Sequence, residues 1–213
     1  MRRMPVLGAV VLLVAIGGPA ASGASTTNTT MSATIAEASW STLDPDTGMG
    51  EFGVLQFARH DGVTEAFLAR SFGEIVLCEG GDTPADPTDD SFGFVGTDVS
   101  GSGPATMALG KQYTSAKASG TVTVEIVTYD ECTGDFGTTT TKTLKVSLAL
   151  TAVSPLIRQQ TRSTLRVPGE LSAHTVIRGV LREAAGLAKI GTTRIDADGA
   201  IGQLTLREHA TTR

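Results

Sequence analysis

The segment Gly120–Thr151 (GTVTVEIVTYDECTGDFGTTTTKTLKVSLALT) contains two runs in which apolar and polar residues alternate. The first run places three apolar residues on one side of an extended chain: Val122, Val124 and Ile126. The second run does the same with four: Leu144, Val146, Leu148 and Leu150. Successive strand residues point to opposite faces, so each run predicts a strand with one dry and one wet face. The acidic residues and glycines between the runs favour a turn. The segment therefore predicts one long β-hairpin.

Similar alternating runs recur along the chain and are separated by turn sequences such as Asp44–Gly48, Asp61-Gly62, Gly101–Pro104 and Asp198-Gly199. Short strands at this spacing are typical of β-sandwiches and barrels. We expect a single antiparallel all-β domain over 33–213 with about a dozen strands, either a sandwich or a barrel-like closed sheet. Besides the hairpin, the clearest expected strands are 33–42, 53–59, 63–70, 72–78, 160–167, 172–182, 187–195 and 201–209.

The stretch 180–190 is the least regular part of this pattern. Its core, LREAAGLAK, has the composition of a helix. Gly186 interrupts it and its flanks are extended, so we favour strand-turn-strand and keep a short helix as the alternative. The segment 79–90, which is acidic and rich in glycine and proline, is expected to be a long exposed loop.

The amino terminus has the form of a secretory signal peptide. Arg2 and Arg3 precede an apolar run over 6–16, and small residues follow up to Ala24. This run is shorter than the roughly 20 apolar residues that a spanning helix needs, which disfavours an uncleaved membrane anchor. We expect cleavage after Ala24, a flexible polar leader over 25–32, and a secreted protein with no membrane span.

Cys78 and Cys132 are the two cysteines of the chain. In an exported protein an even pair predicts a disulfide. Closing a loop of this size contributes about 4 kcal/mol to stability in the chain-entropy model. Neither cysteine has a second cysteine or a histidine at metal-ligand spacing, so a metal or redox pair is disfavoured.

The net charge of −5 is unevenly distributed. From 25 to 154 there are 6 Lys/Arg against 17 Asp/Glu, whereas from 155 to 213 there are 9 against 5. Four arginines are expected on solvent faces of neighbouring strands: Arg162, Arg166, Arg178 and Arg182. We favour pairing of these arginines with the upstream carboxylates across the sheet. The alternative is a basic face for an anionic partner.

No stretch of the sequence matches a catalytic or cofactor-binding motif. His60, His174 and His209 are the three histidines, and no Gly-x-Ser-x-Gly sequence accompanies them. The acidic turns fail the spacing of a calcium loop, and phosphate-binding glycine motifs are absent. The overall acidity and the lack of aromatic residues interleaved with arginine argue against nucleic-acid binding. We expect no catalytic residue, no cofactor and no metal.

The order of features resembles that of a group of uncharacterised secreted bacterial proteins of the kind found in actinobacteria. A signal peptide is followed by Trp40, a Thr/Val strand ending near Cys132, a Leu/Val/Ser strand and Arg162-Ser163-Thr164. The resemblance covers roughly 33–209 and implies an exported all-β protein, without an activity to transfer.

Together these observations favour a secreted, non-enzymatic binding or surface-interaction domain. Its partner is expected to be a cell-surface polymer or a small ligand, and the ligand's identity stays open. A secreted hydrolase with a site assembled from distant residues is the alternative.

Overall fold

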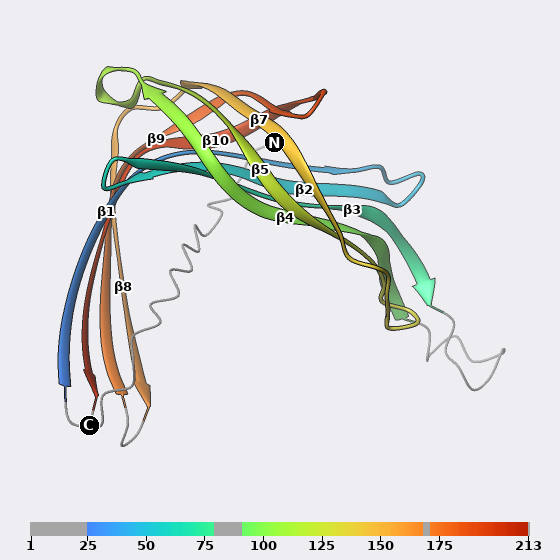
Figure 1. Cartoon of the computed structure of the whole chain (residues 1–213), viewed down its shortest axis with the longest axis horizontal. Helices are drawn as coiled ribbons and strands as arrows, with labels where there is room; N and C mark the ends of the chain where they lie inside the picture. The colour runs from blue at the N-terminus through green and yellow to red at the C-terminus, as the bar shows by residue number, and fades with distance from the viewer. Residues whose placement is uncertain (1–24, 79–90, 168–170, 213) are drawn as a thin grey trace.

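The computed structural model describes residues 25–78, 91–167 and 171–212, which form ten β-strands and a short 3-10 helix (Figure 1). In chain order they are β1 (Ser25–Leu43), β2 (Met49–His60), β3 (Val63–Cys78), β4 (Ser91–Leu109), η1 (Lys111–Tyr113), β5 (Ser115–Asp130), β6 (Asp135–Phe136), β7 (Thr140–Ala152), β8 (Ile157–Val167), β9 (Leu171–Ile190) and β10 (Thr193–Thr212). No helix within these ranges is long and apolar enough to cross a bilayer. The predicted signal peptide over 1–24 and the predicted loop over 79–90 lie outside the described residues.

The strands form one antiparallel sheet that closes on itself. The hydrogen-bonded order is β10, β1, β2, β3, β4, β5, β7 and β9, and β9 pairs with β10 to complete a ring. The all-β antiparallel fold is therefore confirmed, and the closed pairing corresponds to the barrel-like form of the prediction. The described strands are fewer and longer than expected, since all but β6 have 11 to 20 residues.

The predicted hairpin is present as β5 and β7. The two strands pair from Ser115↔Thr151 to Ile126↔Thr140. Val122 and Leu148 are among the residues that point into the ring and are almost fully buried. The two-residue alternation of the sequence is thus the inside–outside alternation of the ring wall.

The interior of the ring is a hydrophobic core. Phe57, Leu55, Leu68 and Ile201 are each 0% exposed, and no polar or charged residue is buried among the described residues. Leu55 and Leu68 are direct partners across β2 and β3. Burying each such side chain contributes roughly 1.5–3 kcal/mol. The ring therefore serves as a filled scaffold.

Glycines inside strands mark places where a neighbouring backbone approaches closely. A Cβ at Gly101 would overlap the carbonyl oxygen of Thr123, and a Cβ at Gly199 would overlap that of Glu37. Glycine is favoured where one backbone approaches another this closely. Gly101 lies within β4 and Gly199 within β10, so the turns predicted at 101–104 and at Asp198-Gly199 are wrong.

β9 continues without interruption through the stretch expected to be strand-turn-strand or helix. Gly186 pairs with Leu150 of β7 and Ala197 of β10, and a Cβ there would overlap a β7 carbonyl oxygen. Pairing on both edges overrides the helical composition. The chain reverses instead at Gly191, whose φ is +60°.

Four strand segments extend beyond the ring as a four-stranded antiparallel sheet, at the lower left of Figure 1. Its order is β1, β10, β9, β8, and it uses the first half of β1, the second half of β10, the first half of β9 and all of β8. We call this sheet the extension. The segment 25–32, predicted to be a flexible leader, belongs to β1 and pairs with β10 from Ser25↔Thr212 onward. Residues 25–32 are therefore part of a strand and not a flexible leader, because hydrogen bonding to β10 holds this polar segment in place.

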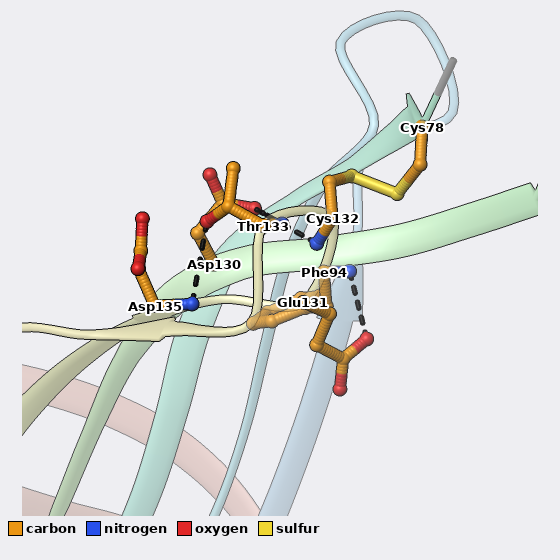
Figure 2. The surroundings of a disulfide bond; sticks show 7 residues. All are labelled: Cys78, Phe94, Asp130, Glu131, Cys132, Thr133 and Asp135. Carbon is orange, nitrogen blue, oxygen red and sulfur yellow. Dashed lines mark hydrogen bonds between the residues drawn. A yellow bond between two sulfur atoms is a disulfide. The ribbon is translucent and has the colours of Figure 1, made fainter. Parts of the chain in front are cut away.

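The disulfide lies at the opposite end of the molecule. Cys78 ends β3 and is bonded to Cys132 in the turn after β5, with a Cα–Cα distance of 5.1 Å, as predicted. The bond passes over β4 at Gly93, where a Cβ would lie 2.5 Å from the Cys78 sulfur. Figure 2 shows the turn, in which the Asp130 carboxylate accepts the Cys132 amide at 2.9 Å and the Glu131 carboxylate accepts the amide of Phe94 at 2.9 Å.

Candidate anion-binding face

Strand register brings basic side chains from three strands to one face of the extension. Residues paired across neighbouring antiparallel strands share a face, as do alternate residues along each strand. Arg162 on β8 pairs with Val176 on β9, which pairs with Arg207 on β10. The same rule groups six exposed residues, which we call the basic face: Arg158, Arg162, His174, Arg178, Arg207 and His209.

The described residues of this face include no carboxylate. Glu208, the acidic residue of the described part of the extension, pairs with Thr29 and Thr175 on the opposite face. The ion pair Arg70–Glu51 at 2.9 Å and the contact of His60 with Asp61 at 3.2 Å are formed by ring strands and the turn between β2 and β3. The charge distribution of the sequence favoured pairing of the downstream arginines with upstream carboxylates. The described residues of the basic face form no such pair.

The arrangement leaves neighbouring positive charges uncompensated within the described part of the chain. Two unit charges 10 Å apart in water repel by about 0.4 kcal/mol, so an exposed sheet tolerates several of them. Like charges on adjacent strands still lower sheet stability. An anion bound over the face would replace this repulsion with attraction.

The two histidines of the basic face lie directly opposite each other on β9 and β10. The Nδ1 atom of His209 donates to the Asn28 side-chain oxygen at 2.7 Å. The Nδ1 atom of His174 is hydrogen-bonded to the Thr164 hydroxyl at 2.9 Å. These contacts hold each ring through its Nδ1 atom, so the Nε2 atom of each histidine is left for a ligand contact.

The four arginines singled out in the sequence have different positions. Arg162 and Arg178 belong to the basic face. Arg166 lies in β8, but its side chain is outside the described residues.

Arg182 is committed to a structural role. It lies where the extension joins the ring, opposite the break 153–156 between β7 and β8. Its Nε donates to the Gln112 carbonyl at 2.8 Å, and its Nη1 donates to the Ser154 carbonyl at 3.0 Å. Arg182 therefore fastens the β4–β5 connection to this break.

Arg158, Arg207 and the two histidines were not predicted from the sequence to belong to this face. Arg158 precedes the strand expected from 160, although β8 begins at Ile157. Arg207 and His209 are two residues apart in the expected strand 201–209, so the sequence did place them on the same face of that strand. The meaning of this placement depended on the register of β9 with β10, which differs from the one implied by the turn predicted at Asp198-Gly199.

Among the described residues, no histidine combines a hydroxyl or thiol partner with a carboxylate partner, which is the arrangement of a nucleophilic triad. His60 contacts Asp61, while the other two contact Thr164 and Asn28. No group of three or more potential metal ligands occurs in the described part of the chain.

No family model, curated protein or solved structure matches this chain. The resemblance to secreted actinobacterial proteins therefore stays a prediction, and functional inference depends on the chain's own geometry.

Proposed function

We propose that the protein is an exported, non-enzymatic binding module whose basic face binds an anionic ligand. The observation that carries this proposal is the clustering of four arginines and two histidines on one sheet face, without a carboxylate among its described residues. A charged group of one sign gathered on an exposed surface attracts ligands of the opposite sign.

The division of the molecule supports this assignment. The ring is filled by apolar side chains, and the extension projects from it as a continuation of β1, β9 and β10 with β8 at its edge (Figure 1). Export is supported by the expected signal sequence over 1–24 and by the Cys78–Cys132 disulfide, which is typical of oxidising compartments.

Chromatography on a sulfonate cation exchanger tests the proposal. At pH 7.5 and low salt a protein of net charge −5 would not be retained unless a local basic surface engages the resin. We expect the wild type to be retained and the variant Arg162→Gln/Arg178→Gln/Arg207→Gln to flow through. Arg194→Gln is the matched control, because Arg194 is an exposed arginine of β10 outside the basic face. Flow-through of the wild type, or equal retention of the triple variant, would overturn the proposal.

A further inference from the structure

Resting on the proposed function, we propose that the ligand is a linear, hydroxyl-rich polyanion that crosses β8, β9 and β10 in an extended form. Three features of the face support this ligand: the spacing of its arginines, the neutral groups between them and the open shape of the surface.

Three arginines lie on a diagonal across three adjacent strands. Arg158 on β8 pairs with Val180 on β9, and Arg178 is two residues away on the same face. Arg178 pairs with Thr205 on β10, and Arg207 is again two residues away on the same face. Diagonal neighbours of this kind are about 7–8 Å apart between Cα atoms. The three arginines thus form a row with two equal steps.

Equal steps favour a ligand with repeated charges. A small anion between two neighbouring arginines satisfies one step of the row and leaves the third arginine without a partner. A polymer with regularly spaced anionic groups contacts all three, and each contact after the first is intramolecular. Arg162 adds a fourth charge beside the row, because it pairs with Val176, which lies two residues from Arg178 on β9 and pairs with Arg207 on β10.

The groups between the arginines are neutral hydrogen-bonding side chains. Gln160 accepts from the Arg178 Nε at 3.2 Å, and Ser32 and Thr205 form a hydroxyl pair at 3.1 Å. No Phe, Tyr or Trp occurs among the described strand residues of this face. Single-stranded nucleic acids are held largely by stacking on aromatic rings, whereas hydroxyl and amide groups suit the hydroxyls of sugar or polyol units.

The surface is open, with its six basic side chains exposed. Small-molecule sites are usually concave and bury most of the ligand. Two shallow hollows lie on the ring. One is lined mainly by β4, β5 and β7, the other mainly by β9 and β10, and neither is lined by a residue of the basic face. An extended chain lying on the sheet fits this shape.

The test is isothermal titration of the full chain with defined probes at several salt concentrations. The polymers are a 12-unit poly(glycerol phosphate) and a 12-unit oligogalacturonate, each compared with its monomer, and a 12-nucleotide oligothymidylate is the nucleic-acid probe. We expect at least one of the two polymers to bind at least about 100-fold more tightly than its monomer. Whether it is the phosphate or the carboxylate polymer identifies the source of the negative charge. Replacing Arg158, Arg178 and Arg207 with glutamine should lower the slope of log K against log salt by about one per arginine. Arg194→Gln should leave the slope unchanged.

Three results would overturn the inference. Monomers that bind as tightly as polymers would leave anion binding intact but reject the polymer. Oligothymidylate that binds more tightly than both polymers would assign the face to nucleic acid. Failure of every anionic probe would reject the proposed function together with this inference.

Discussion

Removal of the disulfide should destabilise the protein strongly without altering the ring. The cysteines are 54 residues apart in sequence, and a cross-link of that span removes about 4 kcal/mol of chain entropy from the unfolded state. Both lie at the far end of β3 and β5, where Cys132 is exposed and Cys78 is half-buried, so replacing them with alanine removes little packing. We therefore expect Cys78→Ala/Cys132→Ala to lose about 4 kcal/mol, almost entirely through the unfolded chain.

Urea unfolding followed by the fluorescence of Trp40 measures this loss. Trp40 is the single tryptophan and is 8% exposed in the core, so its emission reports the ring. For a denaturant slope of about 2 kcal/mol per molar, the midpoint should fall by about 2 M. The wild type with reductant should match the variant. A loss below about 1 kcal/mol would contradict the stabilising role of the disulfide. Altered Trp40 emission of the folded variant in water would show that the disulfide shapes the ring.

Four further substitutions test the scaffold and the neighbourhood of the basic face. Gly199→Val should cost about 3 kcal/mol, because its Cβ overlaps a neighbouring strand; a urea midpoint equal to that of the wild type would show that the ring can relax there. Arg182→Gln should cost about 2 kcal/mol through two lost charged hydrogen bonds, whereas Arg162→Gln should change thermal stability by less than about 0.5 kcal/mol; equal effects would contradict their different roles. Glu51→Ala removes the carboxylate that accepts the Trp40 indole N–H at 2.6 Å, and should shift folded-state tryptophan emission and cost about 2 kcal/mol; unchanged emission would show that this hydrogen bond is not maintained in solution.

Local elements with a clear period were predictable from the sequence. The β5–β7 hairpin followed from alternating apolar residues on both arms, and the Asp61-Gly62 turn followed from a dipeptide suited to positive φ, with observed values of +49° and +82°. These features depend on neighbours in sequence. Closure of the ring depends on pairing between β10 and both β1 and β9, and alternation alone does not specify which strands meet.

Glycine was the main source of misplaced turns. Gly101, Gly186 and Gly199 lie inside long strands where a neighbouring carbonyl approaches the backbone. Glycine is needed in a turn for its backbone angles, and inside these strands because a neighbouring backbone comes close. A single sequence does not distinguish the two cases, because only the tertiary pairing shows which strands approach each other.

The basic face was only partly accessible to sequence reasoning. Arg162 and Arg178 were recognised because they alternate along expected strands. The expected neutralisation by upstream acids rested on residue counts, and counts do not give positions. The register of β8, β9 and β10 places the described carboxylates elsewhere, and this register is a property of the fold.

The most direct test of an anion-binding face is to observe the arginine side chains themselves. Two-dimensional NMR of arginine Nε–Hε groups, recorded while poly(glycerol phosphate) or oligogalacturonate is added, reports each guanidinium separately. We predict that the resonances of Arg158, Arg162, Arg178 and Arg207 shift together and saturably, while that of Arg194 on the ring stays unchanged. Shifts centred on Arg194, or no saturable shift at the four arginines, would contradict the assignment of the basic face as the binding surface.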